Sequence, residues 1–398
     1  MKIKNIRPVL LSAPYAKPAE NLEVDFHLKS GYRTTGLVEI TLDDGTTGIG
    51  EAYLAVFAPR VFVEIVNLVR PYLLNMEMMD IPSLMQRISI VTGYWSFQGA
   101  AQHVVSAFDI ALHDCKGKLL NLPVYKLYDP LAKNTIQLYG SGGDSSMPGY
   151  MNNEFAYLNS LGIRYFKIRA RKNQVHKTIY ALKKGREVGI EIAVDMTQNL
   201  VNPGNSMDEI LLFYDTIHVG SDANIFFFEE VLGVNDGHLY PELRAKLPVK
   251  IAGGEIVTTS QELNQRIGQS WYDIVQPDAT VVGGISAVLE VFKNANVCNT
   301  DVFVHCWGGP VCMAANYHAA LAAGGSMAEW PMPFYPLRDI MMVEPWNIKD
   351  GQLTISDKPG LGVELTREIE EEFKFKEEAV YSCIPDHSSV LSDNIWCI

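Results

Sequence analysis

The stretch FKIRARK, residues 166–172, alternates apolar and basic side chains. Neighbouring side chains of an extended chain point to opposite faces, so Lys167 and Arg169 would share one face and Phe166 and Ile168 the other. Taken alone, this pattern also fits a half-exposed strand with a solvated charged face. The repeat to which the stretch belongs decides between the two interpretations.

This stretch lies in one of eight short apolar runs that end in a polar residue and alternate with helix-like segments. The runs are TIQLYGSGG (135–143), YFKIR (165–169), IEIAVD (190–195), IFFFEE (225–230), VKIAGGE (249–255), YDIVQPD (272–278), DVFVHC (301–306) and SMAEW (326–330). They recur about every 27 residues, close to the ~31 expected for eight βα units. Amphipathic segments such as 176–189 and 260–268 separate them, as a parallel barrel requires. We therefore predict an α/β fold with a (β/α)8-type barrel, a modified TIM barrel, over residues 126–349.

The first 125 residues follow another pattern. GLVEITLDDGTTGIGEAY (36–53) contains two alternating runs joined by Asp-Asp-Gly, which is a hairpin signal. Residues 100–120 have the pattern of a helix that ends near Gly117. We expect residues 1–125 to form a separate α+β domain.

Composition excludes several classes of partner. The 398 residues carry a formal net charge of −13, which argues against a nucleic-acid surface or an anionic membrane, because both attract basic patches. No apolar run reaches the ~18 residues of a membrane span, and Pro8 interrupts the N-terminal apolar segment, so we expect a cytoplasmic protein. The 6 cysteines form no CxxC pair, which fits reduced core thiols better than zinc ligation or disulfides.

Carboxylates end three consecutive predicted strands, at Asp195, Glu229 and Glu255. The C-terminal ends of barrel strands form one rim, where these groups could converge and where like charges would demand a cation. Hard oxygen donors without a histidine or thiolate on the same strands favour Mg²⁺. Each acid taken singly could instead be a helix N-cap or a solvated strand end.

Asp278 and His305 end the next two strands. A carboxylate bonded to one imidazole nitrogen would fix the tautomer and leave the other nitrogen as a base, although a lone histidine here could also be a satisfied core residue. Lys167 and Arg169 would lie across the barrel mouth as cations for a substrate carboxylate, and Glu329 would be a hydrogen-bond donor. Metal, cations and base together suit removal of the weakly acidic proton beside a carboxylate.

Over nearly its whole length the chain resembles the mandelate racemase and muconate lactonising branch of the enolase superfamily. The segments that carry the resemblance are SAFDIALHDCKGKLLNLPVYKL, KIR, IAGGE, VQPD, VHCWGG and DKPGLGVEL. The resemblance implies metal ligation by Asp195, Glu229 and Glu255, a dyad of His305 and Asp278, and Glu329 near the substrate carboxylate. It also implies that the N-terminal domain caps the barrel and that residues 350–398 return to this capping domain.

Three positions depart from the family pattern. Arg169 replaces the second lysine of K-x-K, Thr197 stands where an asparagine often follows the metal aspartate, and Val231 replaces the usual proline. Because arginine stays protonated and is a poor base, a symmetric two-base racemase is disfavoured.

The leading prediction is therefore a Mg²⁺-dependent dehydratase of a sugar acid, an aldonate or an aldarate. It would remove the α-proton with the His305–Asp278 dyad and eliminate the β-hydroxyl, giving a 2-keto-3-deoxy acid. An epimerase or racemase, a lactone cycloisomerase and a non-catalytic metal-binding barrel remain alternatives.

Substrate choice is expected to depend on the capping loops 14–33 and 52–60. The candidate substrate-binding residues are His27, Arg33, Tyr53 and Trp307, although loop residues of these types are often only solvated. We expect a small carboxylate as substrate and a homo-oligomeric assembly. The tail after about residue 376 extends past the usual end of the family and is a candidate subunit contact.

Overall fold

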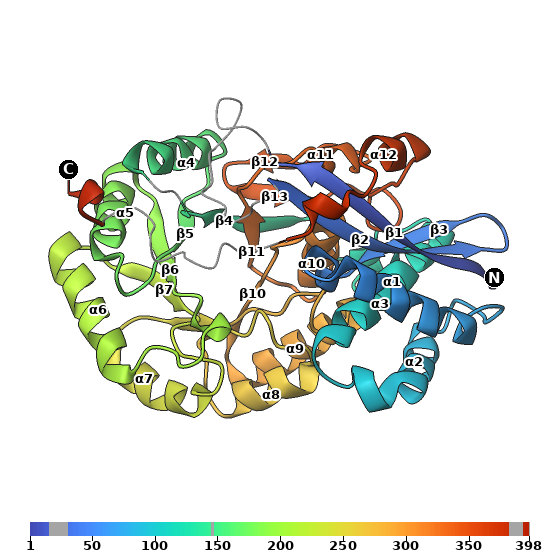
Figure 1. Ribbon diagram of the computed structural model, residues 1–398, viewed down its shortest axis with the longest axis horizontal. Coiled ribbons are helices and arrows are strands. Elements are labelled where there is room, and N and C mark those ends of the chain that lie inside the picture. The colour runs from blue at the N-terminus through green and yellow to red at the C-terminus, as the bar shows by residue number, and fades with distance from the viewer. Residues whose placement is uncertain (16–30, 145–146, 382–392, 398) are drawn as a thin grey trace.

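Eight parallel strands close into a barrel in the computed structural model, which describes residues 1–15, 31–144, 147–381 and 393–397 (Figure 1). Each strand pairs with the next, and the last pairs with the first, so the predicted barrel is confirmed. The strands are β4 (Thr135–Gly142), β5 (Tyr165–Arg169), β6 (Glu191–Asp195), β7 (Ile225–Glu229), β8 (Ile251–Gly253), β9 (Ile274–Val275), β10 (Asp301–Val304) and β11 (Met327–Pro331).

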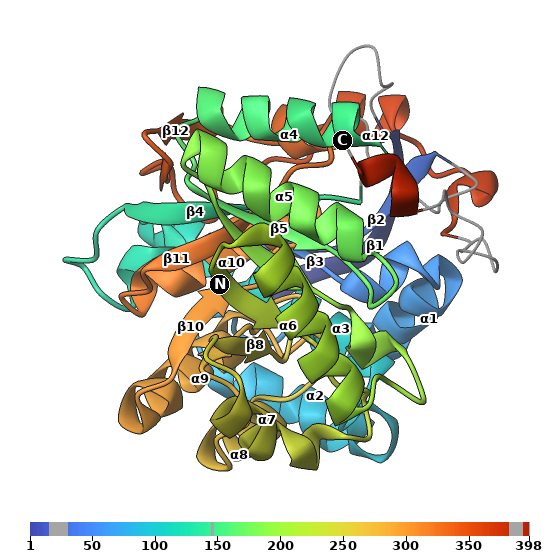
Figure 2. The same ribbon diagram turned by 90° about the vertical axis from the view of Figure 1, so that its left-hand side faces the viewer.

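Helices follow the barrel strands and surround them. They are α4 (Pro148–Ser160), α5 (Val175–Val188), α6 (Met207–Ser221), α7 (Tyr240–Lys246), α8 (Ser260–Gly268), α9 (Ile285–Cys298) and α10 (Pro310–Ala322). Figure 2 shows α4, α5 and α6 side by side on the outer face. A short helix, α11 (Leu337–Ile340), and an antiparallel hairpin, β12 (Asn347–Lys349) and β13 (Gln352–Thr354), follow, and β13 pairs with the start of β4.

The alternation of FKIRARK sets the two faces of β5. Phe166 packs against Phe155 of α4, with ring centroids 5.3 Å apart, while Lys167 points into the barrel and is 2% exposed. Inward residues one layer deeper form an apolar plug, whose members are Tyr139, Ala193, Phe227, Ala252, Ile274, Phe303 and Met327. Two residues further along their strands, Asp195 is in register with both Arg169 and Glu229. The strand period therefore places these ionisable groups in one layer above the plug.

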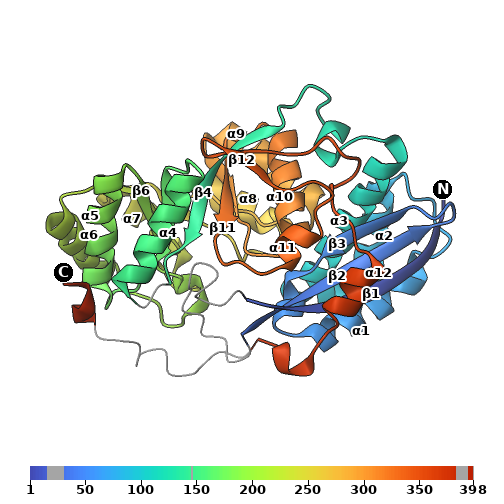
Figure 3. The same cartoon turned by 90° about the horizontal axis from the view of Figure 1, so that it is seen from above.

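The N-terminal domain, called the cap below, lies beside the barrel (Figure 3). Its antiparallel sheet contains β1 (Ile3–Pro14), β2 (Tyr32–Leu42) and β3 (Thr47–Glu51), with the predicted Asp-Asp-Gly turn between β2 and β3. Its helices are α1 (Pro59–Val69), α2 (Ile81–Ser96) and α3 (Ala100–Leu120). Helix α3 packs directly on β3. The approach is so close that a Cβ on Gly50 would lie 1.9 Å from the Ala107 carbonyl oxygen, so only glycine fits at this position.

The C-terminal segment returns to the cap. After helix α12 (Arg367–Glu372), Lys374 lies opposite Leu11 on the free edge of β1, and the Ser12 amide donates to the Phe373 carbonyl at 2.8 Å. Arg7 on β1 forms an ion pair with Glu370 at 2.6 Å. The division of the chain at residues 125 and 350 itself stays a prediction.

A last turn of 3-10 helix, Asp393–Trp396, docks on the barrel rather than on the cap. The Asp393 carboxylate accepts from the backbone amides of His176 and Lys177 at 2.7 and 3.1 Å, at the start of α5. The Trp396 ring packs against Tyr180, with centroids 5.5 Å apart. These intramolecular contacts hold the turn Asp393–Trp396 against helix α5 of the barrel.

Within the described residues, no helix combines the length and the apolar character needed to cross a membrane.

Candidate active site

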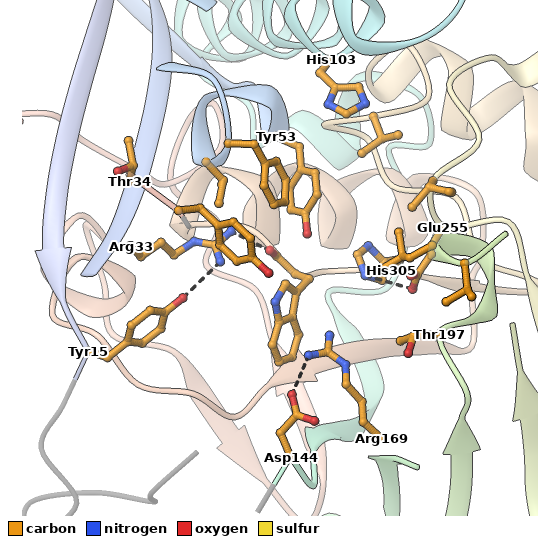
Figure 4. A pocket seen from close by; sticks show the side chains of 18 of the residues that line it. Tyr15, Arg33, Thr34, Tyr53, His103, Asp144, Arg169, Thr197, Glu255 and His305 are labelled. Carbon is orange, nitrogen blue, oxygen red and sulfur yellow. Dashed lines mark hydrogen bonds and ion pairs between the residues drawn. The ribbon is translucent and has the colours of Figure 1, made fainter. Parts of the chain in front are cut away.

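A cavity of about 560 Å³ lies where the C-terminal rim of the barrel meets the cap (Figure 4). The barrel contributes both polar and apolar groups to its wall, and the cap and C-terminal segment contribute mainly aromatic and apolar ones. The residues that line the cavity include Arg33, Tyr53, Phe57, His103, Asp144, Arg169, Thr197, Glu255, His305, Trp307 and Tyr381.

The imidazole of His305 faces this cavity directly after β10. Its Nδ1 lies 2.8 Å from Asp278 Oδ2, and Asp278 Oδ1 accepts from the Thr280 amide and hydroxyl, both at 2.7 Å, and from Asn316 Nδ2 at 3.0 Å. The carboxylate is therefore locked in one orientation, with one oxygen assigned to the imidazole. Asp278 fixes a proton on Nδ1 and leaves Nε2 to face the cavity.

The charges around His305 favour its protonated form. Burial opposes protonation, but Glu329, Glu255 and Asp278 outweigh it and raise the pKa of His305 to about 9. Nε2 lies 3.3 Å from Glu255 Oε2 and 3.7 Å from Glu329 Oε2. For His305 to be neutral, and so able to act as a base, at a pH below about 9, the negative charge of these carboxylates must be compensated.

Lys167 lies beneath the cavity rather than in its wall. Its Nζ is 2.5 Å from Glu229 Oε1 and 3.0 Å from Glu329 Oε1. Although burial opposes protonation, Glu229 and Glu329 raise the pKa of Lys167 well above its usual value. In this arrangement Lys167 neutralises two buried carboxylates and is not exposed to a substrate, which differs from the expected position across the mouth.

Arg169 is one of two barrel cations that line the cavity; the other is Arg171. Arg169 lies 3.1 Å from Asp144 Oδ2, and its guanidinium stacks 4.2 Å from the centre of the Trp307 ring. Trp307 is itself held from the cap, because Arg33 Nη2 donates to its carbonyl oxygen at 2.6 Å. Glu51, at the end of β3, accepts from the Gly309 and Cys312 amides at 2.6 and 3.0 Å. Two cap residues thus fix the segment that follows His305.

The three candidate metal ligands are buried and lie close enough to affect one another's ionisation. Burial, with Glu255 adding to it, raises the pKa of Asp195 to about 6, and burial raises that of Glu229 well above its usual value. Burial also disfavours ionised Glu255, but His305 and Lys167 outweigh this and lower its pKa. Such a set of buried carboxylates has the donor chemistry and the uncompensated charge that suit a hard divalent cation.

The same carboxylates are bonded to protein groups in this structure. Glu229 Oε2 accepts from Gln276 at 2.7 Å, and Glu255 Oε1 accepts from Asn199 at 3.1 Å. Asp195 Oδ1 accepts from the Thr197 amide at 2.6 Å, which Thr197 presents from a left-handed conformation with φ of 48°. Among the residues that the structure describes, no three Asp, Glu, His or Cys side chains are arranged to hold an ion.

Most predicted site residues meet at this place, in two layers. Glu255, His305, Arg169, Trp307, Arg33 and Tyr53 line the cavity, whereas Lys167, Asp195, Glu229, Asp278 and Glu329 lie beneath or behind its wall. Glu329 Oε2 accepts from the Cys306 amide at 2.7 Å, so it supports the His305 segment from below. His27 lies outside the described residues.

Sequence reasoning missed several residues of the wall. Asp144 follows β4 and pairs with Arg169, and Tyr381 lies in the C-terminal segment, where its ring contacts Phe57 with centroids 4.9 Å apart. His103 lies on α3, a helix whose pattern signals burial rather than a site. Asp144 followed a predicted strand and could have been found by the rim argument, but the other two offered no local signal.

Two family matches cover most of the chain. Residues 24–128 match the N-terminal domain of the mandelate racemase / muconate lactonizing enzyme family, and residues 151–369 match the family described as enolase C-terminal domain-like.

Individual relatives align over most of their length. An arabinonate dehydratase from Saccharolobus solfataricus is 29% identical over 347 residues, covering 85% of this chain and 90% of that protein. A D-galactonate dehydratase from Verminephrobacter eiseniae is 25% identical, covering 83% and 89%. The crystal structure of the 3,6-anhydro-D-galactonate cycloisomerase from Zobellia galactanivorans superposes with a TM-score of 0.81 at 27% identity, covering 94% and 100%.

Proposed function

The chain belongs to the enolase superfamily, in its mandelate racemase and muconate lactonizing enzyme branch, and from this premise we propose that it is a Mg²⁺-dependent dehydratase of a sugar acid. It would remove the proton beside the carboxylate and eliminate the β-hydroxyl, so that the product is a 2-keto-3-deoxy acid. The dehydratase names of two relatives support this choice of reaction.

The observation that carries the proposal is a single activated base together with permanent arginine cations. Two imidazoles line the described part of the cavity, and of these His305, not His103, is bonded to a carboxylate. Burial opposes the charge of Arg169, but Asp144 and Asp195 outweigh it and raise its pKa further, so Arg169 cannot exchange a proton near neutral pH. One base and fixed arginine cations suit elimination better than inversion.

Asp195, Glu229 and Glu255 would hold the Mg²⁺ that this superfamily uses, and their buried carboxylates fit it chemically. When bound, the ion supplies positive charge where the enolate charge develops. Side chains of the protein perform the proton transfer and bind the substrate carboxylate.

His305 Nε2 accepts the α-proton while Asp278 keeps the Nδ1 proton in place and stabilises the imidazolium that forms. Arg169, stacked on Trp307 and directed by Asp144, binds the substrate carboxylate from the barrel side. Lys167 compensates Glu229 and Glu329 from below, so that a further anion can enter the site.

A lactone cycloisomerase is the second candidate. It would share the α-proton step and differ in the oxygen that leaves, and the name of the Zobellia structure favours it over an epimerase. An epimerase would need a second group that exchanges protons near neutral pH, which Arg169 does not.

The test is a panel of aldonates, aldarates and their lactones incubated with the protein and Mg²⁺, with 2-keto acid formation as the readout. Formation of a 2-keto-3-deoxy acid that stops on chelation supports the proposal. Rapid inversion at C2 without any 2-keto acid would contradict it, and ring opening of an anhydro acid or isomerisation of a lactone alone would favour the cycloisomerase. Assembly into a homo-oligomer stays a prediction.

A further inference from the structure

The hydroxyl of Tyr53 has an unusual position in the cavity wall. Tyr53 begins a single turn of 3-10 helix, Tyr53–Val56, two residues after β3. Its ring is held between Phe57 and His103, with centroid distances of 5.4 and 6.1 Å. Figure 4 shows its hydroxyl pointing into the cavity, toward the side where His305 lies. No hydrogen bond within the described residues engages this hydroxyl, so it is available to a substrate.

The surroundings keep this hydroxyl protonated at rest and also support loss of the proton. Burial raises the pKa of Tyr53, while Arg33 and Arg169 act in the opposite direction. Glu255 adds to the effect of burial. Burial outweighs the two arginines, so the pKa lies above that of a free tyrosine and the phenol is protonated before the reaction, while the charges of Arg33 and Arg169 stabilise the phenolate when the proton leaves.

A buried lysine, a neutral histidine and two arginines of the site suit this role less well. Lys167 is enclosed by Glu229 and Glu329 beneath the wall. Burial lowers the pKa of His103 to about 4, so it is a neutral imidazole, and the remaining N–H of a neutral imidazole is a much weaker acid than a phenol. Arg33 and Arg169 stay protonated throughout.

We propose that Tyr53 is the general acid that protonates the departing β-hydroxyl, a role that rests on the proposed dehydratase function. The α-proton moves to His305 Nε2, and the electron pair of the broken Cα–H bond forms the Cα=Cβ bond. The Cβ–O bond breaks as the hydroxyl takes the Tyr53 proton, and water leaves. The proton on His305 then returns to the Tyr53 phenolate, which restores both groups, and the enol product becomes the 2-keto acid by tautomerisation.

The test is Tyr53→Phe, which removes the hydroxyl and keeps the ring between Phe57 and His103. We expect 2-keto acid formation to fall by at least ~10²-fold, as for loss of a positioned acid. Exchange of the C2 proton of recovered substrate in D₂O, which depends on His305, should continue within about tenfold of wild-type turnover. Tyr381→Phe removes a different hydroxyl from the same wall, and the ratio of elimination to exchange should change far less in that variant.

Three outcomes would overturn this role. Equal loss of exchange and elimination in Tyr53→Phe would mean that Tyr53 positions the substrate. Unchanged dehydration by Tyr53→Phe, in an enzyme whose wild type dehydrates, would refute the role of Tyr53 and leave the proposed function intact. A wild-type protein that forms no 2-keto acid from any sugar acid would refute the proposed function and this role with it.

Discussion

Replacing Asp278 with asparagine should inactivate His305 by moving its proton. Three donors converge on Asp278 Oδ1, two from Thr280 and one from Asn316, so the amide oxygen of the new side chain would stay at that position. The amide nitrogen must then take the place of Oδ2, 2.8 Å from His305 Nδ1. Two N–H groups cannot face each other, and His305 would adopt the tautomer with its proton on Nε2. The nitrogen that faces the substrate would no longer accept a proton.

The expected size of the effect follows from these contacts. Restoring the useful tautomer means giving up the hydrogen bond from the new amide nitrogen to Nδ1 and leaving two buried donors unpaired, together about 4 kcal/mol. At about 1.4 kcal/mol per decade, kcat should fall roughly 10³-fold. His305→Asn, which removes the base altogether, should cost at least as much.

The assay is the initial rate of 2-keto acid formation at saturating substrate, with folding checked by circular dichroism. Thr280→Val is the matched control, because it removes one donor to Oδ1 and leaves the contact between Oδ2 and His305 unchanged. We expect that control to lose less than about tenfold. A folded Asp278→Asn variant within tenfold of wild type would refute the tautomer argument, as would an equal loss in Thr280→Val.

Three further predictions concern the metal, pH and backbone strain. Glu229→Gln should abolish turnover and reduce the rise in melting temperature on adding Mg²⁺, while the barrel remains folded; full activity of the wild type after chelation would contradict the metal assignment. Burial lowers the pKa of His318 to about 4, and its Nδ1 accepts from the Tyr125 amide at 3.2 Å. Below about pH 6.5 this histidine binds a proton in the unfolded chain, whereas in the folded protein it stays neutral down to about pH 4. The free energy of unfolding should therefore be about 2 kcal/mol lower at pH 5 than above pH 6.5. Urea unfolding at pH 8 and pH 5 should show a smaller decrease for His318→Gln than for the wild type. Thr197 has φ of 48°, a left-handed conformation that costs a β-branched residue about 1–2 kcal/mol, so Thr197→Asn should raise the melting temperature, and a lower value would show that the strain is absent.

The barrel and the inner layer of the site could be predicted because both depend on periods. An inward residue two positions beyond another inward residue must point into the same barrel, which places Asp195 above Ala193 and Glu229 above Phe227. The depth of a long side chain does not follow from this rule. Lys167 points inward as predicted, but its Nζ is bonded to Glu229 beneath the cavity, and only the geometry of three strands together shows this.

Contacts between distant parts of the chain were beyond sequence reasoning. Arg33 could be selected as a basic loop residue, but not its contact with the Trp307 carbonyl, which joins residues 274 positions apart. Tyr381 and Asp393 lie in a segment with no repeat and no family pattern. Their positions depend on which surfaces the cap and barrel leave available, and a linear pattern does not contain that information.

The covering of β1 by the C-terminal segment has a consequence for synthesis on the ribosome. The Lys376 amide donates to the Ser12 hydroxyl at 3.0 Å, and the two residues are 364 positions apart. At ~5–20 residues per second, roughly 20 to 70 s separate the appearance of the edge strand from that of its cover. During this time β1 presents unpaired backbone groups to other nascent chains, a known route to intermolecular strand pairing. The order of translation therefore leaves one edge of the cap sheet uncovered until almost the whole chain has been made.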